Sequence, residues 1–96
     1  MVATRLNLGK IRLCRNVKKD LRIYPGWKGY IRSLLDRHRR GDWGDVSDCD
    51  KEKNDFIVKV EAAHECLVSF YNIPGGGICI TTEDPFETPV TTVVAF

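Results

Sequence analysis

The residues best suited to chemistry lie together between positions 37 and 55, in the stretch RHRRGDWGDVSDCDKEKND. Four basic or imidazole side chains come first, a Gly-Asp-Trp-Gly-Asp motif follows, and an acid-rich segment ends the stretch. Clustered aspartates can supply oxygen ligands to a divalent ion, and four stand close together here: Asp42, Asp45, Asp48 and Asp50. Their spacing differs from that of a calcium-binding loop, so we predict neither a metal nor a cofactor in this stretch.

Catalytic chemistry has few candidate residues in this chain. A small hydrolase or nuclease would need His38, Asp42, Asp45 and Glu83 to converge, and nothing in their spacing requires that. No serine or cysteine stands in a motif that would place it beside a histidine. The H-x-C pair at 64 and 66 offers two zinc ligands, but the second pair of a closed zinc site is missing. We therefore predict that the chain is not an enzyme.

The Gly-Asp-Trp-Gly-Asp motif also has a structural interpretation. In a turn between two helices, Gly41 and Gly44 would take left-handed geometry, and the aspartates would accept hydrogen bonds from backbone amides. Trp43 would fold back to cover the hydrophobic core. We expect Gly41, Trp43 and Gly44 to be structural residues, with Trp43 largely buried.

The two halves of the chain carry opposite charge. Residues 1–40 hold twelve Lys and Arg against two Asp, a net charge of +10, whereas residues 41–96 hold three Lys against eleven Asp and Glu, a net charge of −8. Such asymmetry is typical of a basic surface for nucleic acid, of an acidic surface for a basic partner, or of halves that neutralise each other after folding. The sequence leaves these three interpretations open.

Two candidate binding surfaces follow from this charge distribution. An acidic surface that meets a basic partner would comprise Asp42, Asp45, Asp48, Asp50, Glu52 and Asp55. A nucleic-acid-binding surface would use the basic side chains of one helix, namely Lys28, Arg32, Arg37, Arg39 and Arg40. An upstream basic group would extend this second surface through Arg15, Lys18, Lys19 and Arg22.

Hydrophobic periodicity predicts two main helices and three to four strands. A helix over 26–40 follows from apolar stripe residues at spacings of three and four: Trp27, Tyr30, Ile31, Leu34, Leu35 and His38. Ser47 starts a second helix, whose apolar side we assign to Phe56, Ile57 and Val60. Segments 66–71, 78–83 and 90–96 have the composition of strands, and the glycine triplet 75–77 predicts a hairpin between the first two. A strand within 6–13 and a short helix before Pro25 would complete the elements.

These elements predict a single α+β domain over residues 1–96, with two helices packed on a small antiparallel sheet of three to four strands. The N-terminal residues lack the order of a signal peptide, and no apolar run is long enough to span a bilayer. We therefore expect a cytoplasmic protein that makes no membrane contact and keeps its four cysteines as thiols. The oligomeric state does not follow from the sequence.

Several short motifs occur in an order that resembles a known group of proteins. They are H-x-x-G-D-W-G-D from His38, D-K-x-x-N from Asp50, S-x-Y from Ser69, I-x-T-E from Ile80 and T-T-V from Thr91. Together they resemble a family of small uncharacterised proteins carried on plasmids, conjugative elements and phages, often labelled plasmid-related protein. This chain departs from the family pattern at Cys79, at Asp84 to Phe86 and in a longer link before Ser69.

The resemblance implies a setting rather than an activity, because small proteins carried on mobile DNA commonly act by binding a component of the host. We therefore expect a non-catalytic interaction protein of a mobile genetic element, and specifically an inhibitor of a host defence complex such as a CRISPR effector. Its partner would be a host protein or nucleoprotein complex. A nucleic-acid-binding protein is the alternative, and a metal-dependent hydrolase or nuclease is the third hypothesis.

Overall fold

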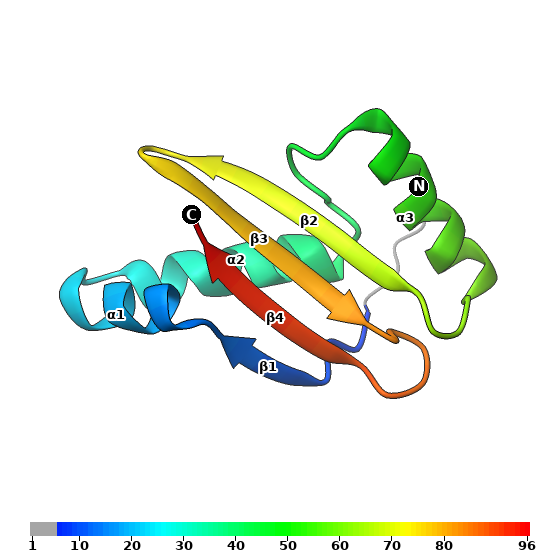
Figure 1. The fold of residues 1–96 in the computed structure, drawn as a ribbon, viewed down its shortest axis with the longest axis horizontal. Helices are drawn as coiled ribbons and strands as arrows, with labels where there is room; N and C mark the ends of the chain where they lie inside the picture. The colour runs from blue at the N-terminus through cyan, green and yellow to red at the C-terminus, as the bar shows by residue number, and fades with distance from the viewer. Residues whose placement is uncertain (1–5) are drawn as a thin grey trace.

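Three helices and four strands make up residues 6–96, the part of the chain that the computed structural model describes (Figure 1). In chain order the elements are β1 (Lys10–Leu13), α1 (Arg15–Ile23), α2 (Trp27–Arg39), α3 (Asp48–Val60), β2 (Cys66–Ile73), β3 (Gly76–Glu83) and β4 (Val90–Ala95). The predicted α+β class is confirmed, and the short helix expected before Pro25 is α1. None of the three helices in this described part has the length and hydrophobicity needed to cross a bilayer.

The four strands form one mixed sheet in the order β1-β4-β3-β2. β2, β3 and β4 are the predicted antiparallel meander, and β1 joins it as the fourth strand. β1 runs parallel to β4, with Lys10 opposite Val90 and Leu13 opposite Val93, so the sheet is not antiparallel throughout. Parallel neighbours need a long crossover connection, and here the whole chain from α1 to β3 provides it.

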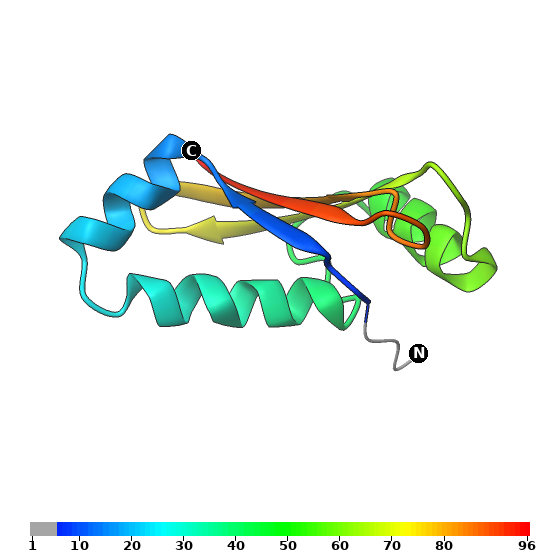
Figure 2. The same cartoon turned by 90° about the horizontal axis from the view of Figure 1, so that it is seen from below.

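Helix α2 covers one face of the sheet, and no described helix lies over the centre of the opposite face (Figure 2). The predicted stripe directs the packing, since Ile31, Leu34 and His38 are all buried. Tyr30 is an exception, because its side chain is 39% exposed and stacks on Trp27 with 5.5 Å between ring centroids. Although the sequence places Tyr30 in the apolar stripe, the structure leaves it outside the core, because it lies at the margin of the stripe rather than at its centre.

Buried apolar side chains form two clusters along the covered face. The larger cluster joins α1, α2 and the inward residues of the sheet, and it comprises Val17, Ile31, Leu34, Tyr71, Ile78, Ile80 and Val93. The smaller cluster lies toward α3 and comprises Leu6, Trp43, Ile57 and Leu67. Burial of each large apolar side chain contributes about 2 kcal/mol relative to exposure, so these clusters supply the main driving force for the fold.

Helix α3 packs beside β2 rather than over the sheet (Figure 1). Its start is as predicted, because the Ser47 hydroxyl accepts a hydrogen bond from the Asp50 amide and caps the first turn. A helix that meets only the edge of a sheet buries a narrow stripe, and in α3 that stripe contains Ile57. The assignment of Phe56 and Val60 to the apolar inner side is wrong, since they are 62% and 50% exposed.

Candidate functional site

The Gly-Asp-Trp-Gly-Asp motif forms the turn between α2 and α3, and both of its glycines have the left-handed backbone that was predicted. Gly41 has a φ of 81° and Gly44 a φ of 73°. A Cβ atom on Gly44 would lie 2.3 Å from the carbonyl oxygen of Phe70, so no larger residue fits there. The turn can therefore approach the backbone of β2 directly.

This approach pairs the turn with the outer edge of β2. The amide of Phe70 donates to the carbonyl of Trp43 at 3.1 Å, and the amide of Asp45 donates to the carbonyl of Phe70 at 2.6 Å. Two residues further along β2, the amide of Asn72 donates to the Asp45 carboxylate at 2.8 Å. The motif thus takes the place of a fifth strand over this part of the edge.

Asn54 of α3 closes the next part of the same edge. Its side-chain amide donates to the carbonyl of Val68 at 2.8 Å, and its side-chain oxygen accepts from the amide of Val68 at 3.3 Å. Asn54 is only 2% exposed. An unpaired strand edge can recruit another chain, so the turn and Asn54 together protect β2 from that pairing.

Trp43 holds the turn in place from the inside. It is 4% exposed, as predicted, and lies in the smaller core cluster with Ile57 and Leu67. Its indole N–H donates to the Asp55 carboxylate of α3 at 2.8 Å, and its ring meets the ring of His38 edge-on at a centroid distance of 5.6 Å. Trp43 therefore connects α2, the turn and α3.

Arg37 and Tyr71 fix the first aspartate of the motif. The Arg37 guanidinium donates to the Asp42 carboxylate at 2.7 Å and lies 4.6 Å from the centre of the Tyr71 ring. The Tyr71 hydroxyl donates to the backbone carbonyl of Asp42 at 2.6 Å, and burial raises the pKa of Tyr71 to about 12. The hydrogen bond from Arg37 lowers the pKa of Asp42, so this carboxylate stays ionised in the turn.

His38 is the centre of a buried hydrogen-bond chain that crosses the sheet. Its Nδ1 lies 2.5 Å from the Ser69 hydroxyl, and its Nε2 lies 2.8 Å from the Thr82 hydroxyl. Thr82 lies 2.7 Å from the Thr91 hydroxyl, which donates to the carbonyl of Leu8. The Thr91 hydroxyl donates its hydrogen to Leu8, so it must accept a hydrogen bond from Thr82. Thr82 in turn accepts from Nε2–H of His38, and the Ser69 hydroxyl then donates to Nδ1 of the neutral ring.

Burial favours the neutral imidazole in this chain of hydrogen bonds. His38 is fully buried, and desolvation lowers its pKa to about 4. With both ring nitrogens occupied and no exposure to solvent, His38 cannot exchange a proton with a bound substrate. The structure thus buries His38, the base of the hydrolase hypothesis, and leaves Glu83 exposed on β3, outside this network.

The predicted acidic surface divides into two groups in the structure. Asp42, Asp45 and Asp55 already bind Arg37, the Asn72 amide and the Trp43 indole, although each is exposed to solvent. The other three carboxylates lie exposed in the first two turns of α3 and are Asp48, Asp50 and Glu52. Only this second group is available to a partner without loss of a described internal contact.

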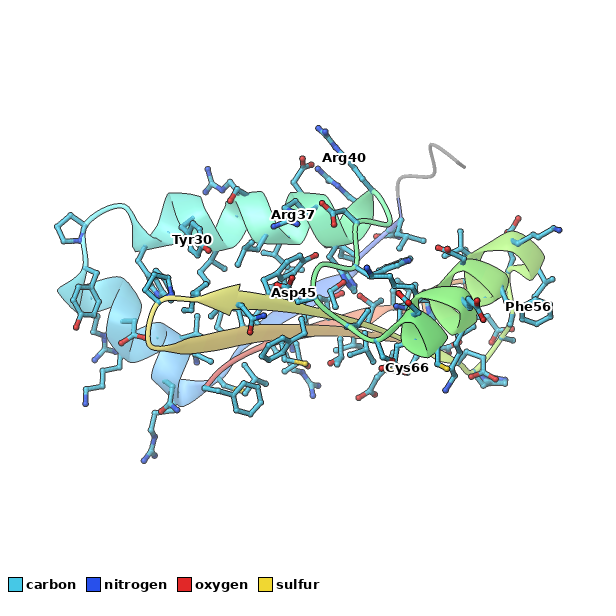
Figure 3. All side chains as sticks on the ribbon, turned by 90° about the horizontal axis from the view of Figure 1, so that it is seen from above. Tyr30, Arg37, Arg40, Asp45, Phe56 and Cys66 are labelled. Atoms are coloured by element: carbon cyan, nitrogen blue, oxygen red, sulfur yellow. The ribbon has the colours of Figure 1, made fainter. Side chains whose placement is uncertain are left out.

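The predicted basic surface on α2 is also partly engaged. Arg37 pairs with Asp42, while Arg39 and Arg40 both pair with Asp36 at 2.8 and 2.9 Å. Lys28 and Arg32 remain exposed, on the outer side of the helix. Figure 3 shows Arg40 projecting from the end of α2, away from the sheet.

The densest group of cations lies instead on α1. Four side chains at spacings of three and four line one exposed face of this helix: Arg15, Lys18, Lys19 and Arg22. No ion pair involves them among the residues that the structure describes. The sequence did contain this signal, because helical periodicity of the cations in RNVKKDLR places all four on one side.

The polar residues inside the sheet have a structural role that the sequence analysis did not assign. Ser69, Thr82 and Thr91 are all fully buried, yet they occupy inward positions of their strands among apolar neighbours. Asn54 likewise had no assigned role. The sequence does show these polar residues at strand positions whose alternation with apolar neighbours predicts burial. Only the tertiary contact with His38 explains why polar side chains are buried there.

Comparison with known family models, curated proteins and solved structures found no match to this chain.

Proposed function

We propose that this chain is a non-catalytic interaction protein that binds a basic protein surface through α3. The observation that carries the proposal is the outer side of α3, where the three available carboxylates share an exposed helix with Phe56 and Val60. Protein interfaces commonly combine aromatic anchor residues with a polar rim. The turn and Asn54 support the proposal because they hold α3 against β2 before any partner binds.

Exposure of Phe56 is the least expected feature of this helix. Its side chain is 62% exposed and projects away from the domain (Figure 3), and Val60 lies one turn further along at 50% exposure. A single exposed apolar residue is ordinary, but two at a spacing of four with acidic residues on the preceding turns form a continuous surface. Such a surface can bury apolar area while its carboxylates meet Lys and Arg.

The cationic face of α1 and the acidic turns of α3 lie at opposite ends of the molecule, which measures 40 Å along its longest axis (Figure 1). Their charges therefore do not neutralise each other. A nucleoprotein complex offers both phosphate groups and basic side chains, so one partner of this class could engage both ends. The family resemblance favours a mobile genetic element, and we infer a cytoplasmic inhibitor of a host defence complex such as a CRISPR effector.

The test of this proposal compares matched variants in partner capture. Asp48→Asn with Glu52→Gln removes charge from α3, and Phe56→Ala removes the apolar group, while Glu65→Gln serves as a control for an exposed carboxylate outside α3. After capture from host lysate and identification of the partner, binding is measured with purified components. We expect Phe56→Ala to weaken binding about tenfold and the charge variant to slow association. Wild-type binding by both α3 variants would refute the proposal.

Direct nucleic-acid binding through α1 is the second candidate function, and the unpaired cations of that helix favour it. A labelled DNA duplex should bind the wild-type chain at low salt and dissociate as salt rises, because cations that contact phosphates release counterions. The variant Lys18→Glu with Lys19→Glu and Arg22→Glu should lose this binding. Absence of duplex binding by the wild type at low salt would exclude this candidate and leave the α3 proposal intact.

A further inference from the structure

A second group of side chains with metal-binding chemistry lies outside the turn, where two loops meet. His64 belongs to the loop between α3 and β2, and Asp84 and Glu87 belong to the loop between β3 and β4. One donor atom from each of the three residues lies within 4.8 Å of the other two. Imidazole nitrogen with carboxylate oxygens is a ligand set typical of zinc and similar divalent ions.

Distances within this group are close to those that an ion would impose. Nδ1 of His64 lies 3.7 Å from the Asp84 carboxylate, and Nε2 lies 3.8 Å from the Glu87 carboxylate. Zinc bonds of 2.0 to 2.2 Å place tetrahedral ligands about 3.4 Å apart. Both separations are too long for hydrogen bonds. They start from different ring nitrogens, so only one of them can be a ligand spacing around a single ion, and each is a few tenths of an ångström longer than that spacing. An ion can bind only one nitrogen of the His64 ring. Glu87 is 53% exposed, so its carboxylate has room to move toward an ion bound at that nitrogen.

The loops hold the central carboxylate in position. Asp84 accepts hydrogen bonds from the backbone amide of His64 at 3.1 Å and from the Thr88 hydroxyl at 2.8 Å. Each of its two carboxylate oxygens therefore has one partner that fixes its position. The Asp84 amide also donates to the carbonyl of Glu65, which ties the two loops together. A ligand held by its own loop requires less ordering when the ion binds.

We propose that His64, Asp84 and Glu87 form a surface binding site for a zinc-class divalent ion, with water in the remaining coordination positions. This site replaces the H-x-C pair considered from the sequence, because Cys66 is not one of the three grouped residues. The site is independent of the proposed α3 interface.

Titration of the full chain with zinc chloride, followed by calorimetry and by NMR of the two histidines, tests the site. We expect one ion per chain, a shift of the His64 ring signals and little change at buried His38. His64→Gln and Glu87→Gln should each weaken zinc binding about tenfold or more, and zinc should raise the melting temperature of the wild type but not of these variants. Magnesium, which prefers all-oxygen ligands, should bind far more weakly.

Two matched variants make the result decisive. Cys66→Ser tests the H-x-C pair, and Glu83→Gln removes an exposed carboxylate outside the three-residue group. Both should bind zinc as the wild type does. Loss of binding in Cys66→Ser, unchanged binding in His64→Gln or Glu87→Gln, or no binding with excess zinc at neutral pH would each overturn the proposal.

Discussion

The two edges of the sheet are protected in opposite ways. β2 is eight residues long, and its outer backbone groups at Val68, Phe70 and Asn72 bind the turn or Asn54. β1 is only four residues long, faces no described strand on its outer side and carries Lys10 and Arg12. A short, charged edge is a poor template for another chain, whereas a long edge is a good one. This difference indicates that the main role of the Gly-Asp-Trp-Gly-Asp motif is to cover the long outer edge of β2.

The comparison also separates the motif from the binding surfaces. Most of the motif residues make contacts that hold the turn. No described hydrogen bond or ion pair joins the turn to the α1 cations or to the side chains of Asp48, Asp50 and Glu52. A change in the motif should therefore act on stability, and a change on either helix surface should act on binding. Each prediction below tests one side of this division.

Of the substitutions predicted below, removal of the Trp43 side chain should lower the free energy of unfolding most. Trp43→Ala takes away a buried indole, so we expect a loss of about 3 to 5 kcal/mol in the free energy of unfolding, measured by urea denaturation. The matched change at the other edge is Ile11→Ala, whose side chain is 40% exposed and should cost less than about 1 kcal/mol. Equal losses would show that the turn adds nothing beyond ordinary burial.

Acid should weaken the hydrogen-bond chain that runs from β2 to the segment before β1. The pKa of His38 is about 4 in the folded chain, below its ordinary value of 6.5, so the unfolded chain takes up the proton first as pH falls. Its contribution to stability is complete above pH 6.5, and about 3 kcal/mol is lost by pH 4.

Measurement of the free energy of unfolding at several pH values tests whether His38 causes this loss of stability. The variant His38→Gln cannot titrate at this position, so its stability should vary less between pH 6.5 and pH 4 than that of the wild type. This window lies above the range in which Asp42 and Asp84 take up protons, because the pKa of each is lowered. Parallel curves for both proteins would show that His38 does not carry the pH dependence.

Substitution of Asn54 tests the protection of the β2 edge and removes much less buried volume than substitution of Trp43. Asn54→Ala leaves the amide and carbonyl of Val68 without their partner, so we expect a loss of about 2 kcal/mol. The opened strand should also increase self-association, which sedimentation velocity would detect as concentration dependence. Asn72→Ala is the matched control, because that side chain is exposed. Self-association equal to that of the control would mean that the turn alone protects β2.

Substitutions on β1, the open edge of the sheet, should change the free energy of unfolding least. Lys10→Thr with Arg12→Thr keeps good strand formers and should change the free energy of unfolding by no more than about 0.5 kcal/mol, because both side chains are exposed. If charge protects β1, this variant should self-associate more than the wild type. An unchanged sedimentation profile would show that the shortness of β1 is protection enough.

Local features of this fold could be predicted because they depend on neighbours in the sequence. The Ser47 cap, the glycine hairpin after β2 and the three-and-four spacing of Ile31 and Leu34 each follow from interactions within a few residues. Burial of Trp43 also followed, because a large aromatic between two turn glycines has few other places to go. The α+β class is the sum of these local choices.

Long-range contacts decided what the sequence left open. Charge composition alone could not show that Arg37, Arg39 and Arg40 bind aspartates of the same chain, or that the α1 cations have no ion pair within residues 6–96. The direction of β1 and the exposure of Phe56 depend on how a helix or strand meets the rest of the sheet.

The amino-acid sequence by itself determined the elements, the turn and the charge of each half. Tertiary structure alone decided that Asn54 completes an edge strand, that His38 is a buried donor to Thr82, and that His64 meets two carboxylates from a distant loop. The physical reason is that hydrogen bonds and ligand sets depend on distances of a few ångströms between atoms. Residues far apart in the chain reach such distances only after the hydrophobic clusters have fixed the positions of the helices and strands.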